Sequence, residues 1–85
     1  MNPHHKAHYQ LEQDGALPMW IICFNTLDYP GKYTARLWRT LPENIPTEYV
    51  MKHDSLEGLR EMIPQTCVCL ARSPEDDPVV VETWL

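Results

Sequence analysis

The stretch YTARLWRTL, residues 33 to 41, alternates in the way that a β-strand with one buried face does. Its two faces would carry Tyr33, Ala35 and Leu37 on one side and Lys32, Thr34, Arg36 and Trp38 on the other. We expect the first set to face the core. The run MWIICFN, residues 19 to 25, is apolar and rich in aromatic and β-branched residues, and so predicts a partner strand.

The connection between these strands contains Pro30 and Gly31, which suit the central positions of a type I or II turn with Gly at positive φ. Proline cannot take the positive φ that tight hairpin turns need at their first central position. We therefore expect a longer loop over residues 26–31. In it, Asp28 would accept backbone hydrogen bonds and Tyr29 would lie near the turn.

Residues 42–53 carry two prolines and no clear period, which predicts an irregular crossing with a short edge strand over residues 49–51. Two further strands are predicted over residues 66–73 and 78–85, joined through the acidic segment PEDD.

A helix is predicted between these strand pairs, because Leu56, Leu59 and Ile63 share one helical face and Pro64 follows them. Either Asp54 or Ser55 would cap its N-terminus. The resulting fold class is α+β: a four-stranded, mostly antiparallel sheet in ββαββ order, with one short helix packed on one face. Which strands are central does not follow from the pattern.

Residues 1–18 show neither the strand nor the helix period, so we expect a disordered leader before a single α+β domain at residues 19–85. We hypothesise that Met19 is the true or an alternative translation start. Deleting the leader should then leave the melting temperature nearly unchanged. His4, His5 and His8 lie in this leader and are interpreted as an unsupported cluster that binds metal only adventitiously.

Composition bounds the class of function. A chain of 85 residues with 44% hydrophobic content supports one small domain, and a net charge of −5 argues against nucleic acid or anionic lipid as a partner. The longest apolar run, residues 19–24, is far too short to span a membrane, and the N-terminus lacks a secretion signal. We expect a cytoplasmic protein with reduced thiols, because its three cysteines cannot all pair within one chain.

Cys67 and Cys69 would project from the same face of a predicted strand, where a metal could bridge them together with His53, Cys23 or a leader histidine. Zinc modules usually bring two cysteine pairs, and this chain has one, so buried inert thiols are favoured. A small Cys/His metal-binding protein is the alternative function, and no cofactor is expected.

Catalysis is not predicted. A nucleophilic cysteine needs a positioned base, and His53 is the only candidate outside the leader. Glu75, Asp76 and Asp77 lie at a predicted hairpin tip without the ligand alternation of an EF-hand, which favours a solvated turn.

The predicted sheet face opposite the helix is the preferred functional surface, because tryptophan and arginine are the residues that anchor protein interfaces. Its candidate residues are Lys32, Arg36, Trp38, Glu82 and Trp84, with Asp28, Tyr29, Pro30 and Gly31 of the loop as further candidates. The same face also fits an ordinary cross-strand pair between Arg36 and Glu82 over half-buried tryptophans. The expected function is a non-enzymatic interaction module that binds a protein partner or a second copy of itself.

The segments DYPGKYTARLW (28–38) and RSPEDDPVVVETWL (72–85), separated by one short helix, resemble a family of small uncharacterised bacterial and phage-associated proteins. The resemblance covers residues 19–85 and leaves the leader outside. It implies no established activity and therefore no catalytic residues.

Overall fold

The structure, a computed structural model, describes residues 2–40, 43–74 and 76–85. Its elements are α1 (Pro3–Gln13), β1 (Pro18–Phe24), β2 (Tyr33–Arg39), β3 (Ile45–His53), α2 (Leu56–Met62), β4 (Cys69–Leu70) and β5 (Val80–Trp84). Within these ranges the strands form one five-stranded antiparallel sheet in the order β3-β2-β1-β5-β4. The predicted α+β class is confirmed. The predicted four strands, ββαββ order and single helix are wrong, because the chain adds α1 at its start and a full strand before α2.

The hairpin of β1 and β2 forms as predicted. Lys32 N donates to Tyr29 O at 3.2 Å, which closes a turn with Pro30 and Gly31 at its centre. Gly31 has a φ of +73°, the left-handed value that glycine takes without steric cost.

β3 occupies the stretch for which an irregular crossing with a short edge strand over residues 49–51 was predicted, and the edge strand is confirmed but longer. It is a nine-residue strand at the edge of the sheet, where the missing N–H of Pro46 need not leave a partner unsatisfied. Its register with β2 shifts between Arg36 and Trp38. Thr47 occupies this irregularity: its hydroxyl donates to Leu37 O at 2.7 Å and accepts from Tyr49 N at 3.2 Å. The Thr47 side chain thus supplies hydrogen bonds to the backbone at the point where the β2–β3 pairing is interrupted.

α2 is the predicted helix. Ser55 is its N-cap, and the Ser55 hydroxyl accepts from Gly58 N at 3.0 Å, so that Asp54 is not needed as a cap. Leu59 and Ile63 are buried in the core and Leu56 packs against it, as their spacing predicted.

The second predicted strand pair is shorter than expected. β4 contains only two residues, Cys69 and Leu70, where a strand over residues 66–73 was predicted. β5 pairs with β1 along most of its length, with a register shift beside Ile22 and Cys23. The ladder between β4 and β5 is therefore a minor part of the sheet.

α1 contradicts the expectation of a disordered leader. The Asn2 side chain caps the helix by accepting from His5 N at 2.8 Å, and His8 is only 2% exposed. The Trp20 indole Nε1 donates to His8 Nδ1 at 3.0 Å, which ties α1 to β1. An amphipathic helix is recognised in a sequence by apolar residues at every inward position. In α1 one inward position is occupied by His8, so the helical period of apolar residues is not visible.

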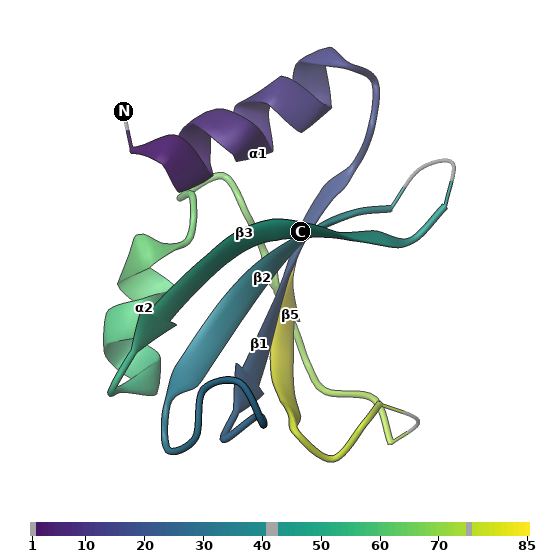
Figure 1. The fold of residues 1–85 in the computed structure, drawn as a ribbon. Helices are drawn as coiled ribbons and strands as arrows, with labels where there is room; N and C mark the ends of the chain where they lie inside the picture. The colour runs from purple at the N-terminus through teal and green to yellow at the C-terminus, as the bar shows by residue number, and fades with distance from the viewer. Residues whose placement is uncertain (1, 41–42, 75) are drawn as a thin grey trace.

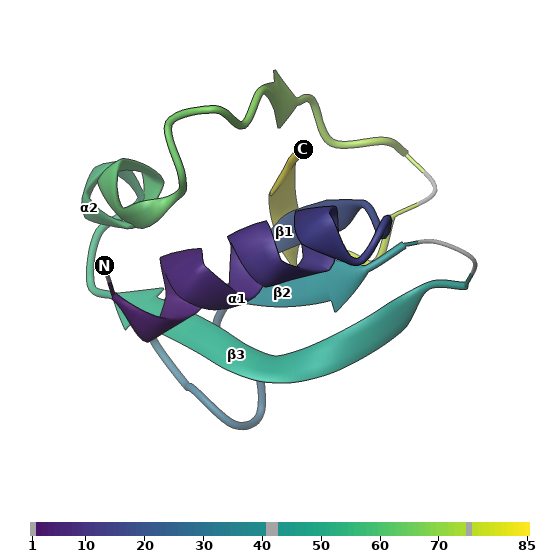
Figure 2. The same cartoon turned by 90° about the horizontal axis from the view of Figure 1, so that it is seen from above.

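Both helices cover the same face of the sheet. The core unites alternate residues of β1, β2 and β3 with Leu59 of α2 and Ile63 directly after it, and Ala7 and Leu11 of α1 pack against it. Figure 1 shows α1 across the top of the sheet, and Figure 2 shows it over β1 and β2 with β3 at one edge. The predicted core face of β2, made by Tyr33, Ala35 and Leu37, is confirmed. In the described part of the chain, no helix is long and apolar enough to cross a membrane.

Candidate functional site

The sheet face opposite the two helices consists of the alternate side chains of the same strands. Cross-strand register places Arg36 between Ile21 and Val50, and pairs Cys23 with Thr34 and Val80. We use the name open face for the half-exposed residues Ile21, Cys23, Arg36, Trp38, Val50 and Val80. Most of them are apolar, so this face presents apolar surface to solvent.

The open face is hollowed. A pocket of about 330 Å³ lies over it, and its rim is formed by Asp28 and Tyr29 from the β1–β2 loop and by Asp77 and Val79 before β5. The two loops lie at the same end of the sheet, because Phe24 N donates to Val79 O at 3.0 Å (Figure 1). The two distinctive segments of the sequence therefore contribute to one hollow.

Arg36 lies in the floor of this hollow. Its Nη1 donates to Thr47 O at 2.7 Å, a contact that fixes the guanidinium beside β3. The cross-strand pair with Glu82 that the sequence also allowed does not form. Arg36 is thus a positive charge in the hollow that no carboxylate among the described residues neutralises in an ion pair.

Glu82 and Trp84 do not belong to the open face, and this part of the predicted surface is wrong. Trp84 pairs with Trp20 and Glu82 with Ile22, which places both on the helix-covered side. Glu82 is 7% exposed, and its two carboxylate oxygens accept from Arg60 Nε at 2.7 Å and Arg60 Nη2 at 2.8 Å.

The Arg60 hydrogen bonds explain how a carboxylate is accommodated on that side. They lower the pKa of Glu82, and the Trp84 indole adds a donor at 3.1 Å from Glu82 Oε1. From sequence alone, a glutamate in a strand is expected to face solvent. Here an arginine four residues into α2 supplies its partner, and no pattern within residues 78–85 indicates that.

Lys32 lies outside the hollow. It forms a hydrogen-bonded ion pair with Asp54, and the hydrogen bond from Lys32 lowers the pKa of the Asp54 carboxyl. The loop backbone is also held differently from the prediction: Asn25 Oδ1, in place of Asp28, accepts from Gly31 N at 2.7 Å. The Asp28 carboxylate is therefore left exposed at the rim.

Cys23 is the thiol in the hollow. Burial raises its pKa, the nearby Asp77 raises it further, and Arg36 opposes them. The thiol therefore stays protonated at neutral pH, which makes it a weak nucleophile. The described residues that line the hollow include no histidine to act as a base.

The predicted metal ligands are not brought together. Cys67 is buried ahead of β4, Cys69 is exposed within β4, and His53 Nδ1 accepts from Ser55 N at 3.0 Å. Over residues 2–40, 43–74 and 76–85, no three His, Cys, Asp or Glu side chains converge into a metal-binding group. The thiol pair fails as a chelate because β4 begins only at Cys69.

His8 is the residue that the sequence interpretation most undervalued. Because the Trp20 indole donates to Nδ1, that nitrogen is the acceptor and Nε2 carries the proton. Nε2 faces Glu12 Oε1 at 3.4 Å and Cys67 Sγ at 4.0 Å. Burial lowers the pKa of His8, and Glu12 opposes this shift. A neutral histidine at this contact keeps α1 on the sheet.

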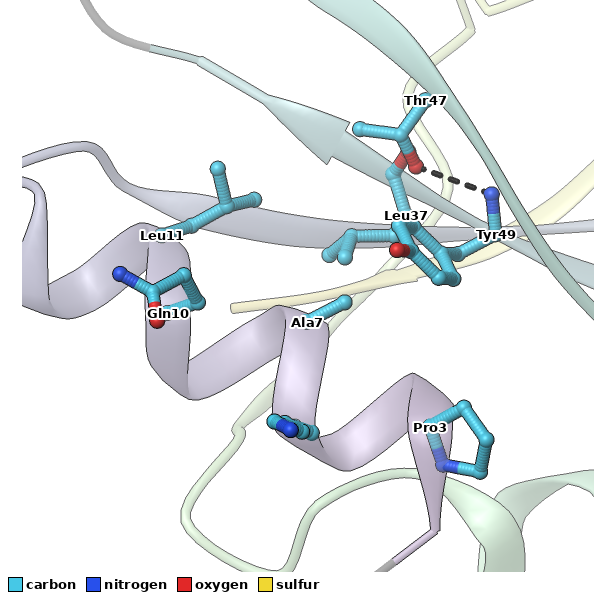
Figure 3. A pocket seen from close by; sticks show the side chains of 8 residues that line it. Pro3, Ala7, Gln10, Leu11, Leu37, Thr47 and Tyr49 are labelled. Atoms are coloured by element: carbon cyan, nitrogen blue, oxygen red, sulfur yellow. Dashed lines mark hydrogen bonds between the residues drawn. The ribbon is translucent and has the colours of Figure 1, made fainter.

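A second hollow, of about 350 Å³, lies between α1 and the sheet (Figure 3). Ala7 and Leu11 point from α1 toward Leu37 and Tyr49 of the sheet. We call it the α1 groove.

Comparison with protein-family models, with curated proteins and with solved structures finds no match.

Proposed function

We propose that this protein is a non-enzymatic interaction module that binds a partner protein through the open face. The observation that carries the proposal is a half-exposed tryptophan and an arginine on a hollowed sheet face that neither helix covers. Aromatic and arginine side chains with apolar neighbours are the composition of the energetic centres of protein interfaces. A protonated Cys23 thiol without a histidine beside it supports a binding role over a catalytic one.

The charges around the hollow favour a basic partner segment. Asp28 and Asp77 form one end of the rim, and the chain as a whole carries a net charge of −5. Two copies of an acidic chain repel each other, whereas a basic segment is attracted by both the rim and the overall field. We therefore place a different protein, rather than a second copy, on the open face.

The hollow also constrains how such a segment lies. From Thr34, beside the acidic rim, to Trp38 the strand rises about 13 Å at its usual spacing. A bound segment would place a Lys or Arg near Asp28 and Asp77, and an apolar side chain against Trp38. An acidic group between them would pair with Arg36.

We place the protein in the cytoplasm, and what supports this is three cysteines that are free of disulfides. We retain the affiliation with the small bacterial and phage-associated family as part of the proposal. Its support remains the two quoted segments, which contribute Asp28, Tyr29 and Asp77 to one rim.

The test begins with native mass spectrometry of tag-free protein. We expect a monomer free of metal. A stable dimer that Trp38→Ala dissociates would put a second copy on the open face, and stoichiometric bound zinc would favour the metal-binding alternative.

Affinity capture from the source cell then compares three baits: the wild-type chain, Trp38→Ala, and Glu61→Ala as a control on the exposed side of α2. We expect a basic protein that the wild type and the control retain and that Trp38→Ala loses. A partner captured equally by all three baits would contradict the open face as the binding surface.

A further inference from the structure

The α1 groove is independent of the open face and has its own chemistry. Its interior is apolar, formed by Ala7, Leu11 and Leu37 with the ring of Tyr49. Two of the polar groups beside them are already occupied: the Thr47 hydroxyl bonds to Leu37 O and Tyr49 N, and Gln10 Nε2 donates to Asp14 Oδ1 at 3.2 Å. The interior therefore suits an apolar chain and offers little to a polar molecule.

The lining of the groove includes one positive side chain. Lys6 lines the groove and forms no ion pair with any described residue. Lys6 also lies near the N-terminus of α1, whose first turn carries no acidic side chain to offset the positive end of the helix dipole. The Tyr49 hydroxyl has no hydrogen-bond partner among the described residues and adds a donor to the lining.

We propose that the α1 groove binds a straight-chain carboxylate, with the carboxylate at Lys6 and the alkyl chain along Ala7 and Leu11. An apolar interior with a cation beside it is complementary to an apolar tail with one negative head. From Lys6 to Leu11 the helix rises about 7.5 Å, which matches a chain of about six carbons. This site requires nothing of the partner proposed for the open face.

The first test is a titration of the full chain with the sodium salts from butanoate to dodecanoate, followed by isothermal calorimetry and by amide chemical shifts. We expect affinity to rise about fourfold with each added methylene and then to level off once the groove is filled. The shifted amides should lie in α1 and β3. No binding anywhere in the series, or affinity that climbs without a limit as for a detergent, would overturn the proposal.

The head group is tested with octanol and with two charge variants. Octanol, which lacks the carboxylate, should bind at least about tenfold more weakly than octanoate, and Lys6→Glu should weaken octanoate by a similar factor. Lys52→Glu changes the net charge equally but lies outside the groove, so it should leave binding unchanged. Equal losses in both lysine variants would mean attraction to overall charge, which contradicts a site.

The tail is tested by Ala7→Leu, which fills part of the groove and keeps a good helix former in α1. We expect its preferred chain to be shorter than that of the wild type, with α1 still folded by circular dichroism. Trp38→Ala should bind the wild-type ligand unchanged, which separates this site from the open face. An unshifted chain-length preference in Ala7→Leu would place the tail elsewhere.

Discussion

The two faces of the sheet are built from the same strands, yet they differ in what covers them. Leu37 is fully buried under the helices, while its neighbour Trp38 lies half exposed on the open face. Part of the covered face lies under α1, a segment whose sequence shows no helical period. The polar contact that holds α1 to the sheet is made by its buried histidine, His8. Alternation thus reveals which residues share a face, whereas the choice of covered face depends on residues far away in the sequence.

The largest expected effect is the loss of α1. Deleting residues 1–18 removes the acceptor of the Trp20 indole and uncovers one end of the core. We expect the free energy of unfolding to fall by about 3 kcal/mol or more, and the melting temperature by about 12 °C or more. Calorimetry measures this, with Gln13→Ala at the exposed end of α1 as the control. An unchanged melting temperature would support the sequence-based expectation of a dispensable leader.

Neighbouring substitutions in β2 compare the two faces directly. Leu37→Ala should cost about 2–5 kcal/mol, the usual range for a fully buried leucine. Trp38→Ala, although it removes a larger side chain, should cost less than half as much, because that side chain already contacts water. Urea denaturation of both variants measures the difference. Equal costs would mean that the open face is covered in solution.

The ion pair between Arg60 and Glu82 tests the covered face at its edge. Arg60→Ala leaves the buried Glu82 carboxylate with only the Trp84 indole as a side-chain donor and should cost about 1–3 kcal/mol. Because the folded protein lowers the pKa of Glu82, the unfolded chain takes up the proton first. This contribution is present above the unfolded pKa of about 4.3 and is lost as pH falls through the lower folded value.

Acid titration followed by circular dichroism measures that dependence. Glu82→Gln should remove it and leave the rest of the acid transition in place. An acid profile identical in wild type and Glu82→Gln would contradict the ion pair.

The smallest expected effect concerns His8. Its pKa is lowered in the folded state, so its contribution is fully present above about pH 6.5 and weakens as pH falls below that value. Protonation adds a hydrogen at Nδ1, which then cannot accept from the Trp20 indole. His8→Gln should cost about 1 kcal/mol at neutral pH and flatten the stability profile between about pH 7 and 5.

A double-mutant cycle isolates this contact. In a Trp20→Phe background, which lacks the indole donor, His8→Gln should have a much smaller effect on the free energy of unfolding. Additive effects of the two substitutions would contradict the hydrogen bond.

Much of the sheet could be predicted from local sequence. The apolar run of β1, the alternation of β2 and the spacing of Leu59 in α2 and Ile63 directly after it each indicate the correct element, since each buries a regular set of apolar side chains. β3 could be predicted only in part: an edge strand was expected over residues 49–51, but Pro46 argues against a longer strand unless it lies at an edge, and edge position is a property of the assembled sheet. α1 was not predicted because one of its inward residues is His8, a polar residue whose burial depends on its contact with Trp20.

The candidate site was predictable only in part. Arg36 and Trp38 share the open face, as alternation in β2 requires, and the loop with Asp28 and Tyr29 lies beside them. Glu82 and Trp84 were assigned to the wrong side because a charged residue in a strand usually faces water. The partner that reverses this, Arg60, belongs to another element.

The most direct test of the contrast between the two faces is hydrogen exchange of the tryptophan indole N–H groups, followed by two-dimensional NMR of the monomer. Trp20 donates to buried His8, Trp84 donates to Glu82, and Trp38 has no acceptor among the described residues. We predict slowest exchange at Trp20, intermediate exchange at Trp84 and fastest exchange at Trp38. Fast exchange at Trp20 would mean that α1 does not cover the sheet, and protection of Trp38 equal to that of Trp20 would mean that the open face is not open.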